Sequence, residues 1–201
     1  MRIIGLTGGI ACGKSTIARW LKAEGAVVID ADAISHALTL PKGKALPAIF
    51  SAFGDEIRLP DGSLNRKALA EAVFADEAKR VRLNAILHPL IAEEIQKKLD
   101  TCRKNDVSVV LLDIPLLYEV GMETLANEVW CVSAPEDVQI QRLLTRDGLT
   151  PEQSVRRIQS QLPLAEKERR ANAVIRTDQP EADTHAEVLR LYRRAPERSL
   201  S

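Results

Sequence analysis

The chain has 201 residues, of which 45% are apolar and 28% are charged, the balance of an ordinary globular protein. Its 28 basic and 28 acidic residues give a formal net charge of zero. That balance argues against binding to bulk nucleic acid or to a membrane surface, although it leaves room for a local basic cluster around phosphate groups.

The three cysteines are Cys12, Cys102 and Cys131, an odd number without a C-x-x-C pair, so we expect a reducing compartment and no structural zinc site. The opening "MRIIGLTGG" leads directly into a strand and a loop, which predicts no signal peptide. No apolar run approaches the ~20 residues of a membrane helix. We therefore predict a cytoplasmic protein.

Short apolar runs that alternate with helical patterns predict a parallel sheet covered by helices. "RIIGLT" precedes glycines and a helical pattern from Lys14, and "AVVID" completes an opening strand–helix–strand unit. "VSVVLLD" is typical of a strand buried on both faces. In chain order, the predicted strands are residues 2–7, 26–30, 107–113, 127–134 and 172–177.

Two segments are longer than a simple crossover needs. Residues 31–105 are mostly helical with a turn at "LPDGS", and predict a helical insert at the C-terminal edge of the sheet. Residues 139–164 predict an arginine-rich helix pair that forms a lid. In the lid, "RDGL" ends the first helix at Gly148, and "TPEQ" begins the second with an N-cap, a first-turn proline and a capping box. The polar tail "APERSLS" is expected to be frayed.

The segment "GGIACGKST" fits the phosphate-binding pattern G-x-x-x-x-G-K-[ST], whereas the dinucleotide pattern G-x-G-x-x-G does not match. Its glycines let backbone N–H groups surround a phosphate at a helix N-terminus. Lys14 offers a mobile charge and Ser15 a hydroxyl for Mg²⁺. The alternative, a glycine turn with a chance lysine, is disfavoured by the flanking strand and helix. The predicted ATP-binding residues here are Gly8, Gly9, Ala11, Cys12, Gly13, Lys14, Ser15 and Thr16.

Cys12 lies inside this loop, and kinase chemistry does not require a thiol there. One interpretation is a small residue that fills space. The other is a thiol activated by the N-terminus of the following helix, which ATP would protect from alkylation.

Residues outside this loop must identify the phosphate acceptor. A GTPase would need D-x-x-G and N-K-x-D at the expected places, and neither occurs. Asp30 and Asp32 follow the second strand, where a carboxylate can take the proton of an attacking hydroxyl. If both belong to the strand, they share one face. The alternative for Asp32 is the N-cap of the next helix, and the two roles can coexist.

In this order, "TGGIACGKS", "DADAISHAL", "FGDEI…DGSLNRKAL", "ILHPLI", "DIPLLYE" and "RLLTRDGL…RIQSQLP" resemble the dephospho-CoA kinases, from Arg2 to about Arg194. The resemblance implies transfer of the ATP γ-phosphate to the 3′-hydroxyl of the dephospho-CoA ribose, the last step of coenzyme A biosynthesis. It implies Asp32 as general base, an acceptor held by the helical insert, and Mg²⁺ as cofactor. The acceptor residues that it implies are Asp32, Arg66, His88, Asp113 and Leu116.

Each of these roles has a plainer alternative. Asp113 ends an apolar strand, so it can serve Mg²⁺ indirectly or only cap the turn before Pro115. His88 precedes Pro89, which favours an extended conformation and allows a packing or turn role alone. Arg66 is also compatible with a solvated charge on a helix. Tyr118 and Glu119 are expected to shape the wall of the site.

Arg142 and Arg146 are four residues apart, so one helix face presents both, with Gln139 on the same stripe. Arginines stabilise the charge that spreads over a transferring phosphoryl group. The alternative is a solvated charged face. Both are predicted to bind ATP, and by resemblance Arg142 is the catalytic lid arginine, alongside Lys14 and Asp32.

The sequence departs from the family pattern at three places. Asn65 and Asn172 stand where aspartate is usual, and "RTDQP" (176–180) lacks the usual Asn-Gly turn that commonly contacts adenine. Adenine contacts are therefore left unassigned.

Together these patterns predict the three-layer P-loop kinase fold, with a five-stranded parallel sheet, in a single domain over residues 1–201. Residues 1–31, 105–138 and 165–195 are predicted to form the nucleotide-binding core, residues 32–104 the acceptor region and residues 139–164 the lid. ATP and dephospho-CoA are the expected partners, with no nucleic acid or membrane, and the chain is either a monomer or a weak homo-oligomer. The open alternatives are a kinase for another small hydroxyl substrate and a non-catalytic nucleotide sensor.

Overall fold

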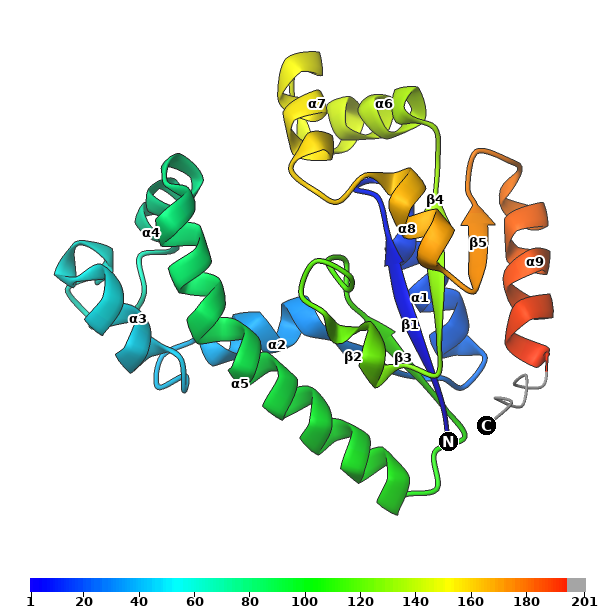
Figure 1. Cartoon of the computed structure of the whole chain (residues 1–201), viewed down its shortest axis with the longest axis horizontal. Coiled ribbons are helices and arrows are strands. Elements are labelled where there is room, and N and C mark those ends of the chain that lie inside the picture. The colour runs from blue at the N-terminus through cyan, green and yellow to red at the C-terminus, as the bar shows by residue number, and fades with distance from the viewer. Residues whose placement is uncertain (195–201) are drawn as a thin grey trace. The chain divides into compact units, whose positions relative to one another are not determined.

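The computed structural model describes residues 1–194, without the side chains of Phe74 and Ala75 (Figure 1). The tail "APERSLS", predicted to be frayed, lies outside the described residues. The chain forms two compact units. The first, here called the core unit, combines Met1–Ile29 with the chain from Cys102 onward, and the second, the insert unit, is Asp30–Thr101.

All five predicted strands are confirmed within a residue or two of their expected ends. The strands are β1 (Arg2–Gly8), β2 (Val27–Asp30), β3 (Val109–Asp113), β4 (Glu128–Ser133) and β5 (Ala173–Arg176). The helices of the core unit are α1 (Lys14–Ala23), the short η2 (Met122–Leu125), α6 (Glu136–Asp147), α7 (Pro151–Gln159), α8 (Leu164–Arg170) and α9 (Glu181–Arg193). Those of the insert are α2 (Ala31–Leu38), α3 (Leu46–Phe53), the short η1 (Asp55–Ile57), α4 (Arg66–Ala75) and most of α5 (Glu77–Lys104).

The strand order β2-β3-β1-β4-β5 places β1 at the centre of the sheet. β1 pairs in parallel with β3 on one side and with β4 on the other, and β4 pairs in parallel with β5. The chain therefore adds β2 and β3 on one side of β1 before it adds β4 and β5 on the other side. In open α/β sheets such a switch point puts the ligand outside the carboxyl ends of the strands. Here that position is the loop after β1.

Helices pack on the sheet because its strands are apolar on both faces. Ile4 and Leu6 of β1 are fully buried and share one core cluster with Ile17 and Leu21 of α1 and Val188 of α9. α8 contacts β1 and β4, and Figure 1 shows it on the viewer's side of these strands with α1 behind them. The predicted α/β layers are thus confirmed. Helices on both faces of the sheet fix the position of β1, which leads into the next loop.

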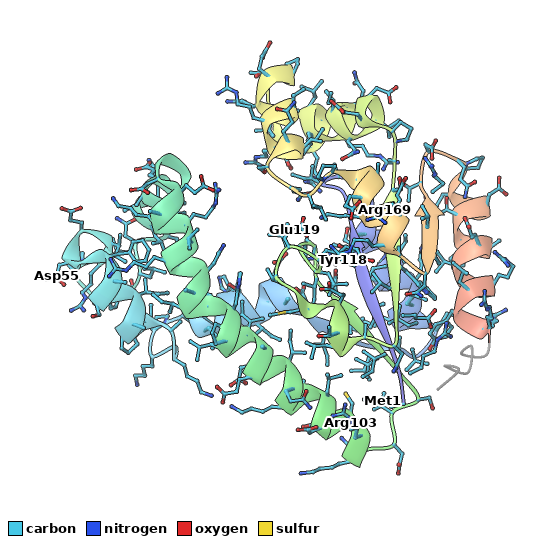
Figure 2. All side chains as sticks on the ribbon, viewed as in Figure 1. Met1, Asp55, Arg103, Tyr118, Glu119 and Arg169 are labelled. Atoms are coloured by element: carbon cyan, nitrogen blue, oxygen red, sulfur yellow. The ribbon has the colours of Figure 1, made fainter. Side chains whose placement is uncertain are left out.

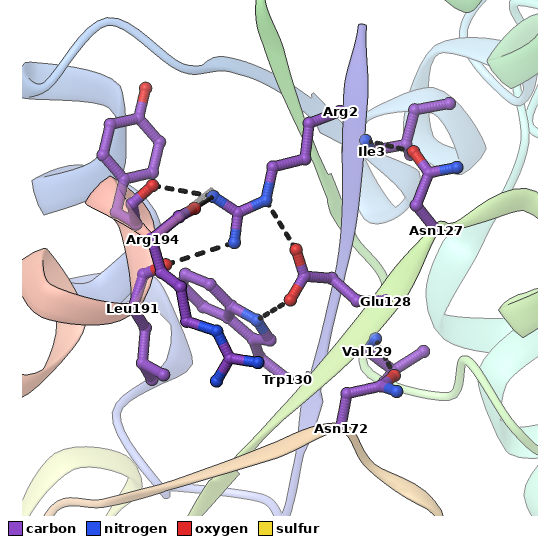
Figure 3. A network of polar contacts seen from close by, with 10 residues as sticks. Arg2, Ile3, Asn127, Glu128, Val129, Trp130, Asn172, Leu191 and Arg194 are labelled. Atoms are coloured by element: carbon purple, nitrogen blue, oxygen red, sulfur yellow. Dashed lines mark hydrogen bonds and ion pairs between the residues drawn. The ribbon is translucent and has the colours of Figure 1, made fainter. Parts of the chain in front are cut away.

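Two asparagines join the starting ends of neighbouring strands (Figure 3). The side-chain oxygen of Asn127 accepts a hydrogen bond from the N–H of Ile3 at 2.7 Å, and that of Asn172 accepts from the N–H of Val129 at 2.7 Å. Asn172, one of the departures from the family pattern, therefore ties β5 to β4.

The boundaries of α6 and α7 follow the sequence signals. α6 ends at Gly148, whose φ of 63° lies in the left-handed region that favours glycine. α7 begins with the predicted capping box, in which Thr150 and Gln153 satisfy each other's backbone N–H groups. Both predicted lid helices therefore form.

In the insert unit, the turn at "LPDGS" is confirmed, since Leu59 and Ser63 are joined by a backbone hydrogen bond of 2.9 Å. Asn65, the other departure, caps α4 by accepting from the N–H of Ala68 at 3.1 Å. The expectation that His88 is extended is wrong, because His88 and Pro89 both lie inside α5. The flanking 28-residue helix outweighs the local preference at one prolyl bond. In the described residues, no helix is long and apolar enough to span a membrane.

Candidate active site

The phosphate-binding loop starts where β1 touches β4. A side-chain carbon at Gly8 would lie 2.4 Å from the carbonyl oxygen of Val132, so only glycine fits there. At the other end Gly13 has a φ of 88° and serves as the N-cap of α1 without a side chain of its own. The first turn of α1 can thus present its N–H groups to an anion, in the way expected of a nucleotide phosphate site.

Lys14 begins α1 and forms an ion pair with Asp113, the last residue of β3. Both side chains are mostly buried, with 18% and 11% of their surface exposed. Asp113 lies opposite Leu6 in the β1–β3 register, so its carboxylate emerges beside the end of β1. The structure therefore brings Asp113, which was expected near the acceptor, to Lys14 of the phosphate-binding loop.

Ser15 is exposed in the first turn of α1, and Thr16 is half-buried behind it. No group of three or more histidine, cysteine or acidic side chains among the described residues forms a ready-made metal cluster. A hydroxyl and a carboxylate from two neighbouring segments, Ser15 and Asp113, are nevertheless the hard oxygen donors that suit Mg²⁺ beside phosphate.

The structure distinguishes between the two interpretations of Cys12, a space-filling residue or an activated thiol. Its side chain is 1% exposed and belongs to the core cluster between the sheet and α1. Burial raises the pKa of the Cys12 thiol to about 11. Burial also raises the pKa of Cys131, to about 12. A protonated, buried thiol is a space-filling group, and the activated-thiol interpretation is disfavoured.

The side chain of Arg142, from α6, reaches the phosphate-binding loop. It donates to the carbonyl of Ala11 at 3.1 Å and to the hydroxyl and carbonyl of Thr177 at 3.0 and 2.6 Å. Arg146 instead pairs with its neighbour Asp147 at 2.7 Å and is 62% exposed. The two arginines predicted to act together therefore have different surroundings, and only Arg142 contacts the loop.

A buried lysine that the sequence analysis did not single out also supports the loop. Lys167 of α8 is completely buried, and its Nζ forms an ion pair with Glu119 at 2.7 Å. The same Nζ donates to the carbonyl of Pro115 at 3.1 Å and to that of Gly8 at 3.5 Å. Lys167 thus joins the loops that follow β1 and β3. No pattern in the charged run "AEKERR" distinguishes this lysine from a solvated one.

The loop after β3 also carries Tyr118 and Glu119, which Figure 2 labels next to each other. Tyr118 is buried under the guanidinium of Arg170, which lies 4.1 Å from the ring centre, and burial raises its pKa to about 12. Glu119 is committed to Lys167. Leu116, predicted to contact the acceptor, is 40% exposed in this same loop.

The insert unit carries the other predicted acceptor residues. Asp30, not Asp32, caps α2: its carboxylate accepts from the N–H groups of Asp32 and Ala33 at 2.8 and 3.0 Å. The strand ends at Asp30, so the expectation that both carboxylates share a strand face is wrong. Asp32 lies in the first turn of α2 with an exposed side chain.

Arg66 is anchored rather than fully solvated. Its guanidinium donates to the carbonyls of His36 and Thr39 at 3.3 and 3.2 Å, which ties the start of α4 to the end of α2. His88 is half-buried in α5, and burial lowers its pKa below the usual value. The lowered pKa favours the neutral imidazole, which is suited to hydrogen bonding rather than to charge pairing.

Comparison with known proteins gives a consistent result. The family model of the dephospho-CoA kinases matches residues 2–183. A dephospho-CoA kinase of Symbiobacterium thermophilum is 45% identical over 195 residues, which make up 97% of this chain and 82% of that protein. A solved structure from Thermus thermophilus is 30% identical with a TM-score of 0.84, over 95% of both chains. The solved dephospho-CoA kinase from Campylobacter jejuni is 29% identical with a TM-score of 0.72, over 96% of both chains. A family match over nearly the whole chain, with the motif residues in place, shows that this protein belongs to the dephospho-CoA kinase family.

Proposed function

We propose that this protein transfers the γ-phosphoryl group of ATP to the 3′-hydroxyl of the ribose of dephospho-CoA. The products are coenzyme A and ADP, and the reaction completes coenzyme A biosynthesis. The observation that carries the assignment is the family match over residues 2–183, together with the phosphate-binding loop and its Lys14–Asp113 pair.

The donor side consists of the loop from Gly8 to Thr16 and the first turn of α1. Backbone N–H groups and the helix dipole bind the phosphates, and Lys14 supplies a charge for the β- and γ-phosphates. Asp113 forms an ion pair with the same ammonium group, so its carboxylate lies beside the proposed phosphate site.

Ser15 and Asp113 are our candidates for holding Mg²⁺, Ser15 directly and Asp113 directly or through a water molecule. When bound, the ion neutralises charge on the β- and γ-phosphate oxygens. The hydroxyl and the carboxylate supply the oxygen donors that such an ion prefers.

Asp32 is our candidate for the general base. Its place two residues beyond β2 and the cap already provided by Asp30 support this role. Arg66, His88 and Leu116 are proposed to contact the acceptor, and residues 32–104 to form most of its binding region. For Arg66, the two carbonyl contacts that fix its guanidinium supply the rigidity that a binding residue needs.

Arg142 is proposed to stabilise the transferring phosphoryl group, because it is the arginine that already reaches the loop. Arg146 is proposed to approach the nucleotide when residues 139–164 close as a lid, which requires it to leave Asp147. Closure serves the chemistry because water competes with the ribose hydroxyl as acceptor. We propose ATP and dephospho-CoA as the substrates, and the cytoplasm as the compartment.

The test uses purified protein with Mg-ATP and a panel of dephospho-CoA, pantothenate, shikimate and nucleosides. ADP release should require dephospho-CoA, and the product should carry a new 3′-phosphate. Release with another panel member and none with dephospho-CoA would mean a different small-molecule kinase. Binding of ATP without turnover of any acceptor would mean a nucleotide sensor.

A further inference from the structure

We propose that Thr177 is a positioning residue of the nucleotide site. Its hydroxyl, oriented by Arg142, fixes the carbonyl of Cys12 in the phosphate-binding loop and so directs the N–H of Gly13 toward the bound diphosphate. The proposal deepens the function proposed above and rests on it only for the identity of the nucleotide.

Thr177 is held in place from both sides. It follows β5 directly, and its N–H donates to the carbonyl of Ser133 at 3.0 Å. Its side-chain atoms come within 3.8–4.0 Å of the position that a side chain on Gly13 would start from. The segment after β5 therefore packs directly against the loop residue that begins α1.

The proton of the Thr177 hydroxyl has a defined direction. Arg142 Nη1 donates to this oxygen at 3.0 Å, and a guanidinium can only donate. The hydroxyl must therefore direct its own proton at an acceptor. The carbonyl of Cys12 lies at 2.9 Å and that of Ser133 at 3.3 Å, and the latter already accepts from the N–H of Thr177. The shorter contact, to Cys12, is the better hydrogen bond.

Arg142 and Thr177 thus hold two successive loop carbonyls. Arg142 also donates to the carbonyl of Ala11, and it is fastened to Thr177 a second time through Nη2. Ala11 has a φ of 58°, an unfavourable backbone conformation for a residue with a side chain, which persists only where its surroundings impose it. Arg142 and Thr177 supply that constraint.

The geometry of the peptide bond carries the effect to the N–H of Gly13. In a planar trans peptide the N–H points opposite to the C=O. The carbonyl of Cys12 and the N–H of Gly13 belong to one peptide unit, so a carbonyl fixed on Thr177 directs the N–H away from Thr177. The N–H of Cys12 behaves differently, since it donates to the carbonyl of Gly9 at 3.2 Å. The hydrogen bond from Thr177 to the carbonyl of Cys12 therefore orients the N–H of Gly13 for phosphate.

The matched variants are Thr177→Val, which keeps the shape without the hydroxyl, and Thr177→Ser, which keeps the hydroxyl. Calorimetry would measure the Kd of ADP, pyrophosphate and AMP for each. We expect Thr177→Val to raise the Kd of ADP and pyrophosphate about tenfold, because the N–H of Gly13 would lose its alignment with the charged phosphate and one hydrogen bond to a charged group is worth about that much. The Kd of AMP should rise by less than about twofold. Thr177→Ser should bind all three ligands nearly as the unchanged protein does.

Equal weakening of ADP and AMP by Thr177→Val would overturn the proposal and assign Thr177 to the adenosine end. Unchanged binding of all ligands would overturn it as well. If Thr177→Val does not fold, Thr177→Ala serves instead, because alanine also lacks the hydroxyl and is smaller than valine. The same loss of pyrophosphate without loss of AMP is expected, and an equal loss overturns the proposal. These readouts need no acceptor, so a failed dephospho-CoA assignment would not affect them.

Discussion

At the scale of single residues, Asp30 and Asp32 show how two identical side chains, two positions apart, can have different roles. The first carboxylate is used by the backbone of α2. The second is not needed for capping. Asparagine caps a helix about as well as aspartate, but it cannot accept a proton from an attacking hydroxyl. The same substitution therefore separates the two roles.

We expect Asp32→Asn to bind ATP normally and to lower kcat by ~10²–10⁴-fold, the usual contribution of a general base. Asp30→Asn, the matched control, should keep kcat within about threefold and leave the melting temperature nearly unchanged. Steady-state kinetics with dephospho-CoA and calorimetry with ATP are the measurements. Turnover of Asp32→Asn close to that of the unchanged protein would show that Asp32 is not the base.

Cys12 allows a prediction about pH. Its pKa of about 11 leaves almost all of the thiol protonated between pH 7 and 9, and the thiolate is the form that reacts. Iodoacetamide at pH 8 should therefore leave Cys12 of the folded protein unmodified and the kinase active, whereas unfolding in urea should expose it to labelling. Mass spectrometry of the loop peptide measures this. Rapid labelling at pH 8 that ATP prevents would restore the activated-thiol interpretation.

At the scale of elements, the sequence predicts what is periodic or local. Each strand is an apolar run, and the cap of α7 is a four-residue signal, so β1–β5 and α7 could be placed without a structure. The conformation at His88 could not, because a long helix tolerates one proline. Lys167 and Thr177 could not either, since the backbone carbonyls of Pro115 and Cys12 that they contact lie more than 50 residues away along the chain. Such contacts depend on the strand order, and no local pattern encodes them.

Arg2 illustrates an element-scale contact with a measurable cost. Its guanidinium lies between β4 and the end of α9 (Figure 3), pairs with Glu128 at 2.5 Å, and donates to the carbonyls of Tyr192 and Leu191 at 2.7 and 3.1 Å. Only 9% of the side chain is exposed. The guanidinium of Arg2 thus pairs with the partly buried carboxylate of Glu128 and also binds carbonyls in the last turn of α9, which have no partner within the helix.

Replacing this cation should cost stability without affecting catalysis. We expect Arg2→Met to lower the free energy of unfolding by roughly 3 kcal/mol, because it leaves Glu128 partly buried without its charged partner. The control is Arg193→Met, which removes a pair with Glu24 in which the arginine is 67% exposed, and which should cost less than about 1 kcal/mol. Urea unfolding gives both values. Equal losses would mean that burial at Arg2 contributes nothing, and an altered KM for ATP would mean that the contact reaches the site.

At the scale of the whole molecule, the proposed nucleotide residues and most of the proposed acceptor residues belong to different units, with Leu116 an acceptor residue of the core unit. The loop, Lys14, Asp113, Arg142 and Thr177 belong to the core unit, whereas Asp32, Arg66 and His88 belong to the insert unit, Asp30–Thr101. The assignment of the insert to the acceptor came from family resemblance, because helical periodicity alone does not name a ligand. It is therefore the prediction that most needs a measurement on the intact protein.

Hydrogen exchange with each ligand alone provides that measurement. A ligand slows exchange of the amides that it orders or covers, so ADP should protect residues 8–16 and the segment after β5, with little effect on α2 and α4. Dephospho-CoA should protect amides of α2, α4 and the first half of α5, because Arg66 ties the first two together and a ligand that engages it restrains both. The Asp32→Asn protein should show the same two patterns, since it lacks only the proposed base. Protection by dephospho-CoA confined to the core unit would contradict the acceptor assignment while leaving the nucleotide site, and the role of Thr177 within it, intact.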